Sequence, residues 1–226
     1  MTLATKIGAG ILATGSVAGL GYAGSAYFKD DKKEINNTQK GTAISKIIED
    51  QFDYILLNTS VNNDSAQWSS NWAKYKKENT TSKDIFELEN WTVNSPTDLI
   101  PALKTKCASL ANTNAVDKAD ANYLNVTKYC AREVTIADQI EKSDLKTKIL
   151  DTKEGDTEHK AIWGKRVSEK TTFKDHFTNL NISFDDADIA KVKAGCKGAT
   201  SKPKTGEKYK ETLEAYKAVC VKQKDE

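Results

Sequence analysis

Leu56-Leu57-Asn58-Thr59 and Ile149-Leu150-Asp151-Thr152 are two versions of one short stretch. The two stretches are offset by 93 residues at Leu57 and Leu150. The same landmarks then follow in each at offsets of 91, 89 and 90 residues: Trp72 and Trp163, Cys107 and Cys196, Cys130 and Cys220. A near-constant offset over unrelated residue types predicts a tandem duplication of one unit of roughly 90 residues.

This spacing divides the chain into four parts. Residues 1–28 form an apolar N-terminal segment and residues 29–41 a polar linker. The first repeat unit then covers 42–133 and the second covers 134–226. The two units are called the first and second halves below.

Apolar periodicity predicts the main helices of each half. The predicted ranges are Ala43–Leu57 and Ser65–Lys77 in the first half, and Val134–Leu150 and Glu158–Glu169 in the second. Trp72 and Trp163 are expected to anchor the core, because Trp buries a large apolar area. Trp68 has no counterpart in this alignment and is predicted to offer a surface contact.

The remainder of each half is predicted as one extended segment and two further helices. The extended segments alternate apolar and polar residues at 86–93 and 177–182. The next helix begins at Ser95–Asp98 or nearer Pro101 in the first half; in the second, Ser183 or Asp185 caps it and it ends at Gly195 and Cys196. A last helix leads to the second cysteine of each half. With four helices in each half, the predicted fold is all-α with helix-on-helix packing.

Composition agrees with a helical protein and argues against a nucleic-acid partner. The chain has only 3 Pro and 12 Gly, and six of the glycines fall in the first 24 residues. Charged residues make up 29% of the chain, but the net charge is only +2. No global positive field is therefore expected.

The N-terminal segment is predicted to anchor the protein in a membrane. Residues 7–28 carry no charge, and as a helix they would span about 33 Å, enough for a hydrocarbon core of about 30 Å. Gly15, Gly19 and Ala23 share one helix face, which would allow close helix pairing and a homo-oligomer. A cleaved signal peptide ending near Gly24-Ser25-Ala26 is the alternative. A dinucleotide fingerprint at 8–13 lacks its preceding strand.

The charges that flank this segment leave its orientation open. Lys6 stands on one side, against Lys29, Lys32 and Lys33 on the other. A positive-inside count therefore favours a body in the cytoplasm.

The sequence contains no constellation typical of catalysis or metal binding. His159 and His176 fall in one half only, and a hydrolase that uses either with Asp175 is a weak hypothesis. Asp185, Asp186 and Asp188 lack the glycine and terminal glutamate of a calcium loop. The cysteines lack zinc-knuckle spacing, and the basic 202–210 stretch has one aromatic residue. We expect no enzyme activity, no metal and no cofactor.

The duplication predicts how the four cysteines pair. Three connectivities are possible. If one ancestral unit folded alone, its two cysteines could bond only each other, and copying would preserve that bond. We therefore predict Cys107–Cys130 and Cys196–Cys220, each worth about 3 kcal/mol in the chain-entropy account. Four buried, reduced thiols are the alternative, since free Cys is commonly buried.

The Gly/Ala-rich start, Met1-Thr2-Leu3-Ala4-Thr5-Lys6-Ile7-Gly8-Ala9-Gly10, together with the spaced Trp and Cys residues, resembles the large paralogous protein families of haemotropic mycoplasmas. The resemblance implies a wall-less parasite of red cells and a membrane-tethered, exposed, variable antigen. It implies no catalytic residues.

Two hypotheses for function follow. The first is a membrane-anchored, surface-exposed interaction or antigen protein that meets a host protein. The second is a membrane-tethered scaffold that faces the cytoplasm.

Overall fold

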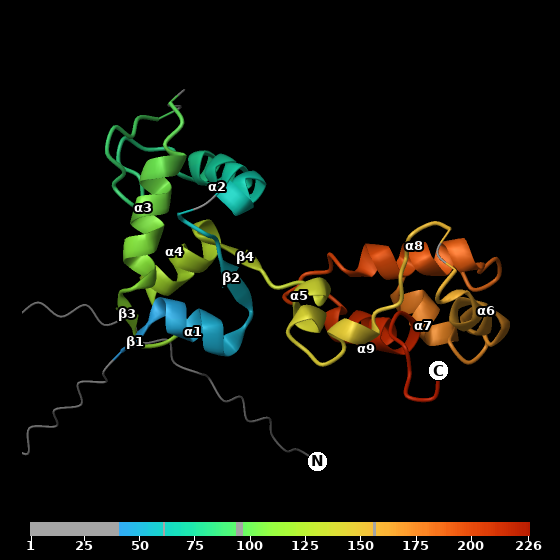
Figure 1. Ribbon diagram of the computed structural model, residues 1–226. Helices are drawn as coiled ribbons and strands as arrows, with labels where there is room; N and C mark the ends of the chain where they lie inside the picture. The colour runs from blue at the N-terminus through green and yellow to red at the C-terminus, as the bar shows by residue number, and fades with distance from the viewer. Residues whose placement is uncertain (1–40, 61, 94–96, 156) are drawn as a thin grey trace, which may run out of the picture. The chain divides into compact units, whose positions relative to one another are not determined.

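The computed structural model describes residues 41–60, 62–93, 97–155 and 157–226 (Figure 1). The predicted membrane segment, with Gly15, Gly19 and Ala23, lies outside these residues. Within the described part of the chain, no helix combines the length and apolar character needed to cross a membrane.

The described chain is mostly helical, as predicted, and its strands have only two or three residues. In the first half the elements are β1 (Thr42–Ala43), α1 (Ile44–Gln51), β2 (Tyr54–Leu56), the 3-10 turn η1 (Asn62–Asp64), α2 (Ser65–Glu78), α3 (Ile100–Ala111), β3 (Asn114–Ala115), α4 (Ala121–Tyr129) and β4 (Ala131–Glu133). In the second half they are α5 (Ile136–Glu141), the 3-10 turn η2 (Lys146–Lys148), α6 (Lys160–Ser168), α7 (Lys174–Asn179), α8 (Ile189–Ala199) and α9 (Tyr209–Val219). Strand β1 pairs with β3 and β2 with β4, both antiparallel.

The first helix is shorter than the predicted Ala43–Leu57. Phe52 adopts the left-handed conformation, with φ 48°, and its N–H closes α1 on the Ile48 carbonyl. The residues that follow turn into β2, where Leu56 pairs with Ala131 of β4. Apolar spacing favoured one long helix, but the left-handed cap ends it and a distant strand takes up the freed backbone groups.

The helix predicted at Val134–Leu150 is likewise broken into α5 and η2. Thr135 and Asp138 form a capping box at the start of α5. Arg132 of β4 binds the Asp138 carboxylate through two hydrogen bonds of 2.6 and 2.8 Å. This bidentate contact lowers the pKa of Asp138 to about 2. The segment that joins the two halves is therefore fixed to the helix that follows it.

The extended segment predicted at 86–93 is not a strand. Phe86 and Leu88 are buried and Glu87 between them is exposed, so the alternation does describe which side chains face inward. The Asp84 carboxylate, however, accepts hydrogen bonds from the N–H groups of Phe86 (2.9 Å) and Leu88 (3.0 Å). A buried side chain thus satisfies the backbone groups that a neighbouring strand would have paired.

The second predicted extended segment, 177–182, is also different. Phe177 belongs to α7, which packs on α9 (Figure 1). Beyond that helix the chain turns at Asn181, whose φ is 56°. Alternation of apolar and polar residues over a segment as short as 177–182 does not distinguish a strand from the end of a helix.

The caps of the following helices refine the sequence expectations. Helix α3 begins at Ile100, with Pro101 in its first turn, as the second of the two predicted starts requires. Helix α8 is capped by Asp188 rather than Ser183 or Asp185, and it continues beyond Cys196 to Ala199. Gly195 permits the close approach of α8 to Ile182, because a Cβ at that position would collide with the Ile182 side chain.

Each half has its own apolar core. One cluster of buried residues runs from Ile44 to Cys130, and the other runs from Ile136 to Val221. In the first core, Tyr75 has ring contacts with four other aromatic residues at 4.9–5.8 Å: Trp72, Phe86, Trp91 and Tyr129. Such rings bury area and add preferred edge-to-face contacts.

Candidate functional site

Both predicted disulfides are present. Cys107 bonds Cys130 with Cα atoms 5.5 Å apart, and Cys196 bonds Cys220 with Cα atoms 5.7 Å apart. Each bond joins the interior of one helix, α3 or α8, to the C-cap of the last helix of its half. All four sulfur-bearing residues are buried, so the bonds lie in the cores and offer no reactive thiol.

The backbone around each disulfide has the same hydrogen bond. The Leu57 N–H donates to the Cys130 carbonyl over 3.0 Å, and the Leu150 N–H donates to the Cys220 carbonyl over 3.0 Å. These are the residues that the sequence pattern pairs at offsets of 93 and 90.

The hydrogen bonds match Trp163 with Trp68, whereas the sequence pattern matched it with Trp72. The Trp163 indole donates to the Asp151 carbonyl over 3.2 Å, and the equivalent donor to Asn58 is Trp68, over 2.9 Å. Trp72 is buried as a core anchor, as is Trp163, but it packs against Tyr75. The surface role predicted for Trp68 is wrong, because only 1% of its surface is exposed. Residue type alone could not decide which first-half Trp matches Trp163. The indole hydrogen bond to the loop carbonyl decides it, because Trp68 and Trp163 both form this bond.

A buried polar side chain follows Trp68 and Trp163 by three residues. Asn71 donates to the two carbonyls on either side of Cys130, at 3.1 and 3.0 Å. Arg166 donates to the two carbonyls on either side of Cys220, at 3.3 and 3.4 Å. Arg166 also binds the Glu226 carboxylate in bidentate fashion, which lowers the pKa of that carboxyl. Sequence reasoning missed both residues, because a polar residue on a helix gives no sign of facing a carbonyl from a distant segment.

The histidines have structural surroundings. His159 Nδ1 accepts the Asp151 N–H over 3.2 Å, next to the Trp163 bond. His176 lies beside Phe173, with ring centres 6.4 Å apart. Asp175 is exposed on the first turn of α7.

The acidic and basic stretches are also engaged. Asp186 pairs with Lys191 at 2.5 Å and Asp188 caps α8. No group of three or more metal-ligating side chains occurs in the described ranges. Within the basic 202–210 stretch, Lys204 binds Asp53 at 2.9 Å and the Phe52 carbonyl at 2.8 Å.

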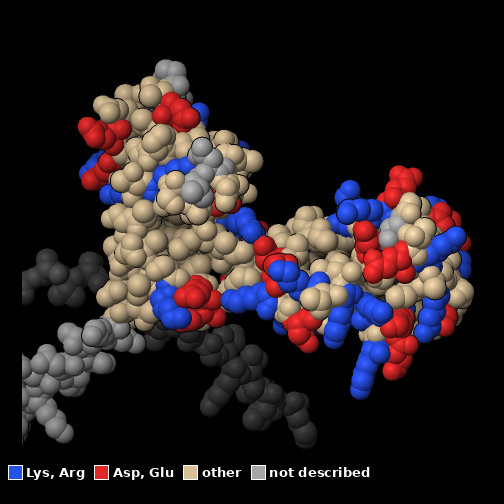
Figure 2. Space-filling view, viewed as in Figure 1, with Lys and Arg blue, Asp and Glu red and all other residues tan. Residues whose placement is uncertain are grey.

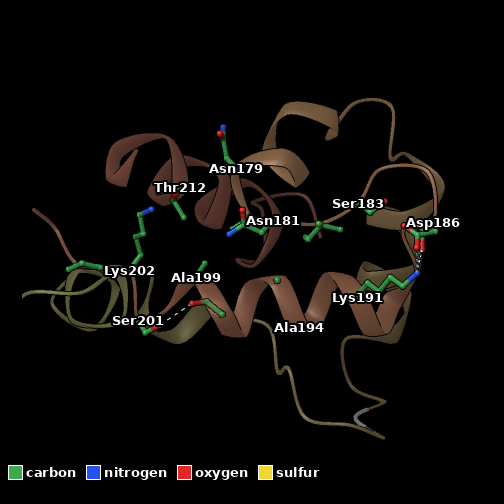
Figure 3. A pocket seen from close by; sticks show the side chains of 15 residues that line it. Asn179, Asn181, Ser183, Asp186, Lys191, Ala194, Ala199, Ser201, Lys202 and Thr212 are labelled. Atoms are coloured by element: carbon green, nitrogen blue, oxygen red, sulfur yellow. Dashed lines mark hydrogen bonds and ion pairs between the residues drawn. The ribbon is translucent and has the colours of Figure 1, made fainter. Parts of the chain in front are cut away.

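One hollow of mixed polar and apolar lining lies between α8 and the 179–183 turn (Figure 3). Its volume is about 680 Å³. Lys202 and Asn181 extend into it, Thr212 borders it from α9, and the Asp186–Lys191 pair stands at one end. The wall along α8 consists of Ala194, Gly195, Gly198 and Ala199. This small-residue wall explains the space, but it does not indicate a ligand.

A second kind of hollow occurs once in each half, at matching positions. In the first half it has a volume of about 630 Å³ and lies beside Thr59, Ile100 and Lys104. In the second half it has a volume of about 970 Å³ and lies beside Thr152, Ile189 and Lys193. Each lysine stands over the buried tryptophan of its half, with Nζ 5.6 Å from the Trp68 ring centre and 5.9 Å from that of Trp163. These paired grooves are the candidate binding sites.

Comparisons of the chain with protein-family models, curated proteins and solved structures find no match.

Proposed function

We propose that the chain is a tandem duplication of one disulfide-bonded unit, held at a membrane by residues 7–28, that acts as a surface-exposed interaction protein without catalytic activity. The paired disulfides are the observation that carries the proposal. Disulfides form and persist in oxidising surroundings and are rare where thiols are kept reduced.

The matched contacts support the duplication. Each half repeats the disulfide, the backbone hydrogen bond to its second cysteine, the indole bond to a loop carbonyl and the polar clamp around that cysteine. The matched residues are 89–95 positions apart. Chance would not reproduce four different interactions at such similar spacings.

The disposition of polar groups supports a binding role rather than catalysis. His159 accepts a backbone N–H, Asp188 caps α8 and Asp186 pairs with Lys191, whereas the paired grooves remain open. A cell-surface interaction or antigen role, with a host protein as partner, agrees with the resemblance drawn from the N-terminus.

Protease treatment of intact cells tests the exposure of the body. The proposal expects cleavage within residues 42–226 while a cytoplasmic marker protein stays whole. The alternative, a tethered scaffold that faces the cytoplasm, expects the body to be cut only after lysis. Protection of the body on intact cells, with a known surface protein removed, would contradict the proposed orientation.

A further inference from the structure

The groove of the second half differs from its first-half counterpart in charge. Among the described residues, it is lined by four lysines, Lys153, Lys160, Lys193 and Lys197, and by one acidic residue, Glu154. We call it the basic groove. The first-half groove is lined by one lysine, Lys104, and one acid, Asp98. The charge of the lining side chains that the structure describes is therefore 4 − 1 = +3 in the second half and 1 − 1 = 0 in the first.

Local geometry identifies which residues correspond. The Lys153 N–H donates to the Asp151 side chain over 2.8 Å, just as the Ser60 N–H donates to the Asn58 side chain over 2.9 Å. Lys153 therefore occupies the position of Ser60.

The other two added lysines replace neutral residues as well. Lys160 is the first residue of α6 and Ser65 the first of α2. Lys197 follows the disulfide cysteine of α8 by one position, as Ala108 follows that of α3. The basic groove thus has lysines at three positions whose first-half counterparts, Ser60, Ser65 and Ala108, are neutral, and Ala108 lines the first-half groove.

Lys193 places a cation inside the groove wall. Only 9% of its surface is exposed. Its ammonium donates to the Lys153 carbonyl over 2.9 Å and stands over the Trp163 ring. None of the four lysines forms an ion pair with a carboxylate of the described residues, although many other lysines do. A nearly buried ammonium is unfavourable when no carboxylate pairs with it, as holds for Lys193 among the residues that the structure describes, and an anion in the groove would relieve that cost.

The remaining surface of the groove is aliphatic. Ile189, Ala190 and Ala194 line it along α8, beside the methylene stems of the lysines. The groove contains no arginine, and Trp163 is fully buried, so neither a bidentate phosphate clamp nor an exposed stacking platform is present in its lining. Several spaced ammonium groups along an aliphatic wall suit a chain that carries several carboxylates.

We propose that the basic groove binds an acidic peptide segment of a partner protein, with Lys193 as the inner cation and Lys153, Lys160 and Lys197 as outer ones. The inference rests on the proposed interaction role and names the chemistry of its partner. It is tested in solution, so its failure would be distinct from a failure of the cell-surface orientation.

The experiment measures binding of a fluorescein-labelled hexaglutamate peptide to the purified full-length chain with both disulfides intact. A hexalysine peptide and a sulfated oligosaccharide serve as comparison probes. We expect one hexaglutamate site per chain, with an affinity that falls as ionic strength rises.

The central variant is Lys153→Ser/Lys160→Ser/Lys197→Ala, which gives these three positions the residues of their first-half counterparts, Ser60, Ser65 and Ala108. It should weaken hexaglutamate binding by at least about tenfold, and Lys193→Met, which keeps the aliphatic packing, by a similar factor. The matched control Lys104→Met changes the equivalent lysine of the neutral groove and should leave binding within about twofold.

A second control separates the groove from net charge. Lys77→Ala/Lys210→Ala/Lys224→Ala removes three exposed lysines that do not line the groove, and it should leave the affinity within about twofold. Circular dichroism spectra and disulfide maps identify any variant that fails to fold.

The reverse substitution provides a gain of function. Ser60→Lys/Ser65→Lys/Asp98→Ala/Ala108→Lys should raise the stoichiometry from one to two hexaglutamate peptides per chain. The proposal is overturned if wild type does not bind hexaglutamate, if it binds only the sulfated oligosaccharide, or if the two lysine-to-neutral triple variants weaken binding equally.

Discussion

The clamp formed by Arg166 makes a sharp prediction about stability. Its guanidinium is 1% exposed and donates to both carbonyls that flank Cys220 and to the Glu226 carboxylate, whose side chain is 6% exposed. Arg166→Met removes the side-chain donor of the Val219 carbonyl, at about 1–3 kcal/mol, and deprives Glu226 of its main partner. The Val221 carbonyl keeps the Gln223 side-chain amide as a donor, at 2.8 Å. Lys165 remains 3.8 Å from Glu226 and softens that loss. We expect the free energy of unfolding to fall by about 3–5 kcal/mol.

A double-mutant cycle gives this prediction its specificity. Glu226→Gln leaves Arg166 with its two carbonyl acceptors, so it should cost less, about 1–3 kcal/mol. The free energy of unfolding of Arg166→Met/Glu226→Gln should lie within about 1 kcal/mol of that of Arg166→Met, because the Glu226 carboxylate contributes little once Arg166 is gone.

The assay is urea denaturation followed by circular dichroism at pH 7, with both disulfides intact. Thermal unfolding gives a check, since about 2–4 °C per kcal/mol is expected for a chain of this size. A loss below about 1 kcal/mol for Arg166→Met, or a double variant whose loss equals the sum of the two single losses, would refute the clamp.

Three further predictions test the packing and the junction between the halves. Gly195→Ala should lower the free energy of unfolding by about 1–3 kcal/mol in urea denaturation, because the added Cβ would meet Ile182, whereas Gly198→Ala, with open space around it, should raise it by about 0.5–1 kcal/mol. Equal effects of the two substitutions would be inconsistent with the packing of α8. Asn71→Ala should cost about 1–3 kcal/mol by the same assay, because two buried carbonyls lose their donor, and a neutral result would show that water replaces it. Hydrogen bonding by Arg132 holds the pKa of Asp138 at about 2, so this carboxylate stabilises the fold above the unfolded pKa of about 4 and loses that contribution as the pH falls toward 2. Asp138→Asn should therefore reduce the loss of stability at acid pH, and an unchanged acid dependence would count against the contact.

The large periodic features of the sequence predicted the mostly helical character of the described chain. Cysteine spacing together with the near-constant offset led to the correct disulfide pairing, because a bond inside each half is the simplest one that the proposed duplication would preserve. Helices α2, α6 and α9 followed from apolar stripes, since a buried face requires that spacing.

The failures came from single long-range contacts. Nothing in the apolar pattern around Phe52 indicates that β4, some 80 residues away, competes for the residues that follow. Asp84 replaces a strand partner with one carboxylate, which alternation cannot reveal. The basic groove was missed as well, because its lysines come from a loop and two helices and meet only in the folded chain.

The distribution of charge over the surface also depends on which residues folding brings together. Figure 2 shows Lys and Arg mixed with Asp and Glu over much of the second half, whereas a broad uncharged area covers part of the first half in that view. A net charge of +2 for the whole chain hides this difference, so composition could exclude a global field but could not locate a local one.

The redox state of the four cysteines in living cells tests the central claim most directly. Cells are quenched in acid, denatured, and alkylated without reductant before peptide mapping by mass spectrometry. The proposed exposed body predicts that all four cysteines escape alkylation and that the peptides map as Cys107–Cys130 and Cys196–Cys220. Alkylation of these cysteines as free thiols, or a peptide that joins Cys107 to Cys196, would contradict it.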